Sequence, residues 1–177
     1  MIILLPSRFN IKQKGHDIAL EACHLLKQKK IAFRLLITGI KPQDYELSAV
    51  FLENIRHYDL QNEIMLSTYS NMQEAYAACD IVISPERYCS YGLSISESLS
   101  LGIPTVINEI PTYSEITKGF PHVHYFTNND PQALANTLFN IIEKQNIERD
   151  RKGAIDFRSK NDIRECAKQF SAIYITL

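Results

Sequence analysis

The sequence predicts a doubly wound α/β fold, in which a parallel, Rossmann-like sheet of about six strands carries helices on both faces. Short apolar runs alternate with longer segments of helical periodicity over most of the chain. The apolar runs contain few polar residues, as is typical of strands that are buried on both faces of a parallel sheet. Glycine, proline and helix-capping residues separate the two kinds of segment. We therefore expect one Rossmann-like domain over residues 1–177.

Six segments have the length and composition of buried strands. The first is an apolar run that is too short for a signal-peptide core and lacks a basic leader. The expected strands are residues 2–6, 33–39, 63–68, 81–85, 104–108 and 122–127. Parallel sheets bind ligands at the carboxyl ends of their strands, so we expect the site in the loops that follow them.

Amphipathic periodicity and capping residues predict the helices. Asn71 and Asp130 are good N-caps, and Pro131 suits the first helical position. Gly102 follows the end of one helix, with Pro104 beyond it. The expected helices are residues 16–30, 45–59, 71–80, 92–101 and 130–145, with a terminal helix over 161–177. The helical pattern weakens in the charged stretch 148–160.

Composition excludes several classes of function. A net charge of −1 gives no electrostatic reason to expect nucleic acid or an anionic membrane as the main ligand. The four cysteines are scattered without a C-x-x-C pair or a histidine at ligand spacing, which argues against a zinc site. Cys23 and Cys79 lie in apolar segments, as reduced core thiols of a cytosolic protein do. No apolar run reaches the length of about 18 residues that a membrane span requires.

The loop after the first expected strand, SRFNIKQKGH, carries cations beside a helix N-terminus. Arg8 and Lys14 precede the helix that Gly15 opens. Two cations together with the positive end of a helix dipole suit a diphosphate. The alternative is that the two cations belong to a basic loop exposed to solvent. We expect the neighbouring Lys12 to be only solvated.

A second helix N-terminus follows the fourth expected strand. Tyr91, Gly92 and Leu93 can present backbone N–H groups there, with no side chain in the way at Gly92. Glu97 lies about one and a half turns into this helix. No Lys or Arg occupies positions 93, 94, 100 or 101, so a helical ion pair does not explain Glu97. A carboxylate there could accept hydrogen bonds from a ribose diol, and the alternative is a glutamate exposed to water.

The order of these motifs resembles the C-terminal domain of GT-B glycosyltransferases, specifically the retaining glycosyltransferase family 4. Arg8, Lys14 and Gly15 are followed by LLITG, YAACDIVISPE and YGLSISESLSLGIPTVIN, and then by Ser114-Glu115. The resemblance covers residues 2–142, and residues 76–115 are its most specific part.

The resemblance implies a site for a nucleotide diphosphate sugar. By position, Arg8 and Lys14 would neutralise the diphosphate and the leaving group, and Glu97 would bind the ribose hydroxyls. The other donor-binding positions implied are Gly39, Thr68, Tyr69, Cys89, Tyr91, Gly92 and Leu93. Residues 67–70 would border the base. No metal and no other cofactor is expected, because the Arg–Lys pair and the helix dipoles would replace a divalent cation.

The chain departs from the family pattern at Cys89, where the first glutamate of the family's pair is expected. A thiol is a weak donor and acceptor, so contacts to the donor sugar would change. Glu86 could swing in, the sugar could lack the usual contacts, or the protein could be a poor catalyst; we favour an altered sugar preference. Cys89 is not expected to be a nucleophile, since no base is placed near it. Lys41 replaces a second glycine and adds either a cation near the site or a solvated side chain.

A complete GT-B enzyme also has an N-terminal acceptor domain, which is absent from this sequence. We therefore expect the donor-binding half of a hexosyltransferase that is inactive alone and acts in polysaccharide or lipopolysaccharide synthesis. Its partners would be a nucleotide sugar, an N-terminal domain or partner subunit, and a glycan or lipid-linked acceptor, but not nucleic acid. We expect it in the cytoplasm or at the inner face of the membrane. The alternative is a non-catalytic nucleotide- or partner-binding module with a degenerate sugar site.

Overall fold

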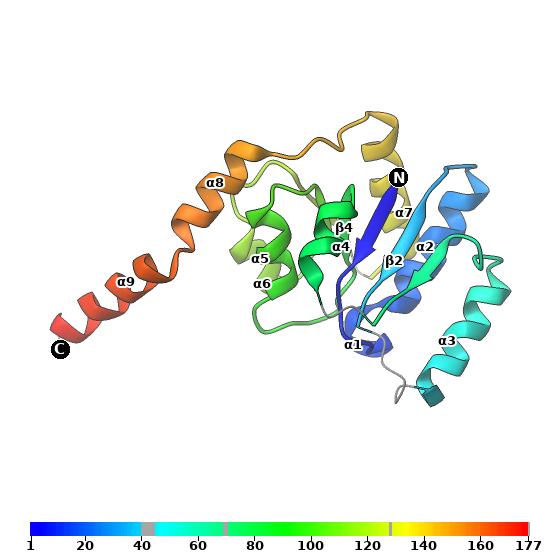
Figure 1. Ribbon diagram of the computed structural model, residues 1–177, viewed down its shortest axis with the longest axis horizontal. Coiled ribbons are helices and arrows are strands. Elements are labelled where there is room, and N and C mark those ends of the chain that lie inside the picture. The colour runs from blue at the N-terminus through cyan, green and yellow to red at the C-terminus, as the bar shows by residue number, and fades with distance from the viewer. Residues whose placement is uncertain (40–44, 69–70, 128, 177) are drawn as a thin grey trace.

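The computed structural model of the chain describes residues 1–39, 45–68, 71–127 and 129–176. Its centre is a sheet of six parallel strands (Figure 1). The strands are β1 (Ile2–Leu5), β2 (Arg34–Ile37), β3 (Ile64–Leu66), β4 (Ile81–Ser84), β5 (Thr105–Asn108) and β6 (Val123–Phe126). Lys41, Tyr69 and Ser70, expected near the site from the sequence, lie outside the described residues.

The strand order β3-β2-β1-β4-β5-β6 is that of a doubly wound sheet. The chain runs outward from β1 to β3, returns to the centre at β4 and runs outward again to β6. Ile3 and Leu4 of β1 pair with Ile81 and Val82 of β4, so the direction of winding reverses between these two strands. Ligands of such sheets bind in the crevice at the carboxyl ends of the strands at this reversal.

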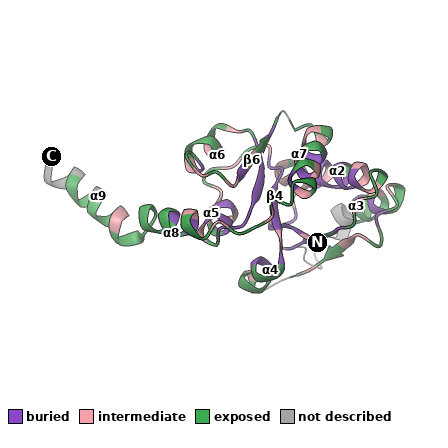
Figure 2. Cartoon of the chain, turned by 90° about the horizontal axis from the view of Figure 1, so that it is seen from above, coloured by how far each residue is buried: buried purple, intermediate pink, exposed green. Residues whose placement is uncertain are grey.

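Helices cover both faces of the sheet, as the sequence predicts (Figures 1 and 2). One face carries α2 (His16–Gln28), α3 (Tyr45–His57) and α7 (Pro131–Glu143), and the other carries α4 (Met72–Ala78), α5 (Leu93–Ser100) and α6 (Pro111–Ile116). Successive side chains of a strand point to opposite faces. Ile3 and Leu5 of β1 accordingly join the first core, and Leu4 joins the second.

The expected helix boundaries at capping residues are confirmed. Asn71 and Asp130 cap α4 and α7, and their side chains accept from the N–H groups of Gln73 and Gln132. The expected strands are one to three residues too long. The predicted run 63–68, for example, contains a β3 of only Ile64–Leu66, because this strand pairs with β2 over three residues alone.

Three helices lie where the sequence pattern predicted none. α1 (Ile11–Lys14) is a single turn capped by Asn10, so the loop after β1 is partly helical, and one turn is too short to show periodicity. α6 is only six residues long. α8 (Arg151–Lys160) forms in the charged stretch because Asp150 caps it and because it buries Ala154 and Phe157. Its other side chains are mostly exposed, which hides the apolar pattern.

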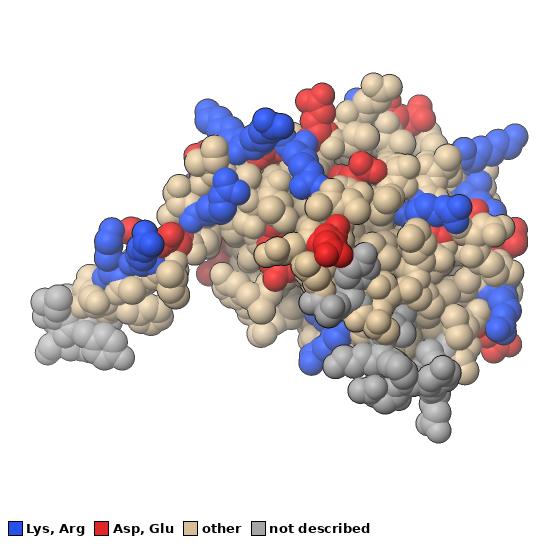
Figure 3. All heavy atoms as spheres, viewed as in Figure 1, with Lys and Arg blue, Asp and Glu red and all other residues tan. Residues whose placement is uncertain are grey.

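The C-terminal helices extend away from the body of the molecule (Figures 1 and 2). The guanidinium of Arg158 in α8 donates to the carbonyl of Ser100, at the end of α5, at 2.6 Å. α9 (Ile163–Thr176) follows, with Ile163 and Phe170 largely exposed. Basic side chains gather over α8, whereas both signs of charge are interspersed elsewhere on the same view (Figure 3). Among the described residues, no helix is long and apolar enough to cross a bilayer.

The connection from β1 to α2 lies directly against the end of β4. Gly15 has φ +66°, and a Cβ built on it would lie 2.0 Å from the carbonyl oxygen of Pro85. A side chain at position 15 would therefore separate the two loops that flank the winding reversal. Gly119 has a similar conformation at φ +86°, but nothing lies within 4 Å of a Cβ there.

We expect Gly15→Ala to destabilise the protein considerably more than Gly119→Ala. Both variants incur the penalty of about 1–2 kcal/mol for a left-handed alanine. Only Gly15→Ala adds a clash with backbone, for which overpacking data suggest roughly 1–3 kcal/mol more. Urea denaturation followed by circular dichroism measures both free energies of unfolding. Equal losses in the two variants would show that the contact with Pro85 imposes no constraint.

Candidate functional site

Two adjoining clefts open beside the loop that follows β1: the first faces the loop after β4, and the second faces the end of β2, α4 and α5. The first cleft has a volume of about 310 Å³ and the second about 270 Å³. The first cleft is lined by Pro6, Ser7, Arg8, Gln13, Lys14, Glu86, Cys89, Ser90, Tyr91, Gly92, Leu93 and Ser94. The second is lined by Pro6, Ser7, Arg8, Thr38, Gly39, Met72, Tyr76, Ser94 and Glu97. Residues 6–8 and Ser94 belong to both walls, so one ligand could extend through both clefts.

The two cations expected from the sequence converge on the first cleft. Arg8 is exposed just beyond β1, and its guanidinium donates to Oε1 of Gln13 at 3.4 Å. Lys14 is the last residue of α1, and only 16% of its side chain is exposed. Their shared cleft gives the loop after β1 a concentration of positive charge that can receive an anion.

The ammonium of Lys14 is paired with the carboxylate of Glu86, which the sequence suggested only as one of three explanations for Cys89. Nζ of Lys14 lies 2.6 Å from Oε1 of Glu86, which is 2% exposed. The Ser84 hydroxyl is 3.4 Å from the same oxygen. Among the described residues, Oε2 of Glu86 has no hydrogen-bond partner. The Glu86 carboxylate thus already lies in the wall of the first cleft and has no need to swing in.

A second set of contacts fastens the loop after β4 to α1 and α2. The guanidinium of Arg87 donates to both oxygens of Asp17, at 3.0 and 2.7 Å. The backbone N–H of Arg87 donates to the carbonyl of Gln13 at 2.9 Å. The side-chain amide of Gln13 donates to the carbonyl of Tyr88 at 3.3 Å. A bidentate ion pair is directional, so it fixes where Lys14 and Arg8 stand relative to the loop after β4.

Gly92 begins α5 at the wall of the first cleft. It is the N-cap at φ +85°, and a Cβ there would lie 2.7 Å from Cε1 of Tyr113. The first amides of a helix have no acceptor within the helix and carry the positive end of its dipole. Tyr91 and Leu93 flank Gly92 with side chains that are 50% and 69% exposed. All three positions line the first cleft.

Glu97 projects into the second cleft, where a tyrosine orients it. The Tyr76 hydroxyl donates to Oε2 of Glu97 at 2.7 Å, and it is 3.2 Å from the carbonyl of Ser94. Burial, together with the hydrogen bond to Glu97, raises the pKa of Tyr76, so the phenol stays protonated and remains a donor. The hydrogen bond from Tyr76 thus gives Glu97 the partner that its own helix does not supply as an ion pair. Sequence reasoning missed this role, although Tyr76 begins the most specific family motif.

Cys89 lies half-buried in the wall of the first cleft. Its carbonyl accepts from the Thr112 hydroxyl at 3.0 Å, which ties the loop to α6. Burial raises the pKa of its thiol, so the sulfur is protonated at neutral pH. A protonated thiol is a weak nucleophile, because the thiolate is the reactive form.

Not every expected donor-site residue reaches the clefts. Gly39 lines the second cleft, where its carbonyl accepts from the Phe9 N–H at 3.3 Å. Thr68 is exposed beyond the end of β3 and lines neither cleft, and Tyr69 lies outside the described residues. In the part of the chain that the structure describes, no group of three or more His, Cys, Asp or Glu side chains could hold a metal ion.

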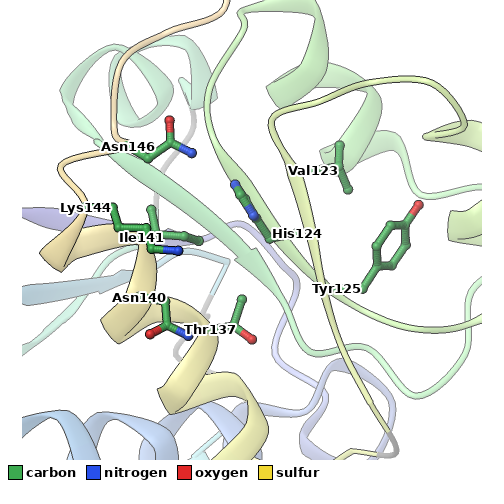
Figure 4. A pocket seen from close by; sticks show the side chains of 8 residues that line it. All are labelled: Val123, His124, Tyr125, Thr137, Asn140, Ile141, Lys144 and Asn146. Atoms are coloured by element: carbon green, nitrogen blue, oxygen red, sulfur yellow. The ribbon is translucent and has the colours of Figure 1, made fainter.

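A larger cleft of about 500 Å³ lies elsewhere, between the edge strand β6 and α7 (Figure 4). His124 points into it toward Asn146 and Ile141, and Lys144 lies beside them. Burial lowers the pKa of His124. This cleft shares no lining residue with the first two, and its walls do not include the loops after β1 and β4.

The family model described as "Glycosyl transferases group 1" matches residues 1–155. The chain belongs to this family. The resemblance inferred from its motifs is thereby confirmed. WcaL of Salmonella typhimurium, a glycosyltransferase named for colanic acid biosynthesis, is 28% identical over 148 residues, which are 77% of this chain and 36% of WcaL. WcaL of Escherichia coli is 26% identical over 72% of this chain and 32% of its own length. The chain thus spans about a third of these relatives.

Solved glycosyltransferase structures share the fold. HepE of Anabaena, solved in complex with UDP and glucose, has a TM-score of 0.84 at 18% identity, over 99% of this chain and 48% of HepE. The C-terminal domain of LpcC from Francisella tularensis has a TM-score of 0.73 at 18% identity, over 90% of this chain and 84% of that domain. These matches confirm the predicted Rossmann-like half of a GT-B architecture.

Beneath the first cleft lies His16, whose ring is fully buried. Its Nε2 is 3.1 Å from the Ser7 hydroxyl, and its ring packs edge-on against Phe9 and Phe51. Burial lowers the pKa of His16 from 6.5 to about 4. The imidazole is therefore neutral at pH 7 and braces the loop that carries Arg8.

We expect His16 to make the stability of the protein decline with acidity. Since its pKa is lower in the folded chain than in the unfolded chain, its contribution is complete above pH 6.5 and is lost as the pH falls toward 4. The shift corresponds to about 3 kcal/mol. Urea unfolding at several pH values should show a shallower decline across this window for His16→Gln than for the wild type. Parallel curves would mean that His16 is not held neutral.

Proposed function

We propose that this chain is the donor-binding domain of a retaining glycosyltransferase. The whole enzyme would transfer a sugar from a nucleotide diphosphate sugar to a glycan or lipid-linked acceptor in polysaccharide synthesis. The observation that carries the proposal is the convergence of Arg8, Lys14 and the N-terminus of α5 on one cleft, with Glu97 in the adjoining one. Membership of the group 1 family and the UDP complexes of HepE support a nucleotide sugar as the ligand.

The first cleft would receive the diphosphate. As the bond between the sugar and its phosphate breaks, negative charge grows on the leaving oxygen. Arg8 and the amides at Gly92 would stabilise that charge at once, and Lys14 would join them as the diphosphate competes with Glu86 for its ammonium. These groups supply the positive charge that a divalent cation would otherwise bring, so the proposal includes no metal.

The second cleft would receive the nucleoside. A carboxylate such as that of Glu97 can accept hydrogen bonds from both hydroxyls of a ribose. Tyr76 holds one of its oxygens at 2.7 Å, which fixes the orientation of the carboxylate before the ligand arrives. A preoriented group loses less conformational entropy on binding.

The acceptor would come from a second domain or subunit. Large apolar side chains stand exposed on the loop beside the first cleft: Tyr88 is 61%, Tyr91 50% and Leu93 69% exposed. A facing N-terminal domain would cover them and exclude water from the reacting bond. We therefore propose that the chain alone binds the donor but transfers little.

A second candidate function rests on Cys89. A thiol in place of the family's first glutamate weakens the expected contacts with the donor sugar. The chain could then be a nucleotide-binding module without transferase activity. Such a module would bind a nucleoside diphosphate and its sugar with equal affinity, and it would transfer no sugar beside a complete acceptor domain.

Substitutions at Arg8 and Glu97 should affect different parts of the ligand. We expect Arg8→Ala to weaken both UDP and inorganic diphosphate about tenfold or more, because it removes charge-assisted hydrogen bonds. Glu97→Gln should weaken the binding of UDP but leave the affinity for inorganic diphosphate unchanged. Titration calorimetry measures both affinities. GDP or ADP replaces UDP if either of them binds more tightly.

Lys12→Ala is the matched control, because Lys12 is an exposed cation of the same loop that lines neither cleft. It should alter neither affinity by more than about twofold. Wild-type affinity for UDP in Arg8→Ala would contradict the proposed site. A loss of affinity for inorganic diphosphate in Glu97→Gln would contradict the division between the two clefts.

Nucleotide binding should not depend on a divalent cation. Because Arg8, Lys14 and the helix dipole supply the positive charge, the Kd of UDP measured with excess EDTA should lie within about twofold of the Kd measured with millimolar MgCl₂. A much tighter Kd with magnesium would mean that the two cations do not suffice.

A further inference from the structure

Among the described residues, Glu86 supplies the one carboxylate that lines the first cleft. The residue is 2% exposed, and its Oε1 faces the Lys14 ammonium at 2.6 Å. Among the described residues, its Oε2 is buried without a hydrogen-bond donor. A buried acceptor without a donor is unfavourable, and for a charged group the penalty is larger. In the part of the chain that the structure describes, this carboxylate can therefore accept at least one further hydrogen bond.

The geometry limits what that donor can be. The terminal torsion of a glutamate is soft, so the carboxylate can turn either oxygen toward a ligand in the cleft. Glu86 shares this cleft with Lys14 and Gly92, where the proposed function puts the diphosphate. A diphosphate only accepts hydrogen bonds, so it cannot satisfy the carboxylate. In a nucleotide sugar, the nearest donors are the hydroxyls of the sugar bound to that diphosphate.

Cys89, three residues further along the same loop, cannot fill this role. It lines the same cleft, but burial raises its pKa and leaves a neutral thiol. A thiol accepts hydrogen bonds weakly, whereas a carboxylate accepts them strongly. The acceptor that position 89 lacks is present at position 86.

We propose that Glu86 is the sugar-specificity residue of this site and accepts a hydrogen bond from a hydroxyl of the donor sugar. This inference rests on the proposed donor site. The ion pair with Lys14 positions the carboxylate, and Cys89 leaves room for a sugar that approaches Glu86. The structural alternative is that Glu86 only tethers Lys14. In that case it acts on the diphosphate and not on the sugar.

The ratio of two dissociation constants separates these roles. We define the sugar increment as the Kd of a nucleoside diphosphate divided by the Kd of its nucleotide sugar. The probes are UDP with UDP-glucose, UDP-galactose and UDP-N-acetylglucosamine, and GDP with GDP-mannose. For the nucleotide sugar with the largest increment in the wild type, Glu86→Gln should reduce that increment about tenfold or more.

The controls test the structural alternative. Arg8→Ala removes a cation of the same cleft that bonds Gln13 and not Glu86, so it should weaken the binding of a nucleoside diphosphate and of its nucleotide sugar equally and leave the increment intact. Glu109→Gln makes the same change at an exposed carboxylate outside both clefts and should alter neither Kd. If Glu86→Gln does not fold, Lys14→Met/Glu86→Met replaces the buried pair as a unit. This variant should lose the increment that Arg8→Ala retains.

Donor sugars that lack single hydroxyls identify the group that Glu86 binds. With the wild type, one deoxy analogue should show no sugar increment. With Glu86→Gln, the same analogue should bind no more weakly than the intact nucleotide sugar, because the two changes remove the same hydrogen bond. An unchanged increment in Glu86→Gln, or a wild type that binds no nucleotide sugar more tightly than its diphosphate, overturns the role of Glu86 but not the donor site. A wild type that binds none of the diphosphates overturns the proposed function itself.

Discussion

The contact between the loops after β1 and β4 is the constraint on which the rest of the site depends. Gly15 lies so close to the Pro85 carbonyl that a Cβ would be only 2.0 Å away. This approach brings Lys14 within 2.6 Å of Glu86 and allows Arg87 to bind Asp17. The strand order makes it possible, because β1 and β4 are adjacent although some 75 residues separate them in sequence. The N-terminus of α5 therefore opens on the same crevice as Arg8 and Lys14.

Among the described residues, two cations and one carboxylate line the first cleft, so Lys14 is paired before any ligand arrives and Arg8 is not. A buried carboxylate is tolerated because a cation faces it, and removing either partner leaves an uncompensated charge. An incoming diphosphate would compete with Glu86 for the ammonium of Lys14, whereas Arg8 is exposed and bound only to Gln13 in the described structure. The two cations expected from the sequence are thus not equivalent. Arg8 is available to an anion at once, and Lys14 is shared with the wall of the cleft.

Much of the fold and part of the site could be predicted from the sequence. Apolar runs and N-caps reveal strands and helices because burial and capping act within a few residues of the chain. The same approach singled out Lys14 beside Gly15 and Gly92 at a helix start, together with Arg8 in the same loop as Lys14 and Glu97 in the helix that Gly92 opens. α1, α6 and α8 escaped it, because a short or largely exposed helix leaves little periodicity. Thr68 was assigned by family position alone, and it lines neither cleft.

The sequence by itself determined the class of fold, the family and the chemical character of the two loops. Only the tertiary structure decided which side chains meet. Tyr76 reaches Glu97 across 21 positions, and Lys14 reaches Glu86 across 72. Neither pair has a signal in local periodicity, because pairing between elements depends on strand order and helix docking. The lack of a donor for Oε2 of Glu86 among the described residues follows for the same reason. Burial is a property of the packed molecule. The role proposed for Glu86, three positions before the expected glutamate, can therefore be argued only from the tertiary structure.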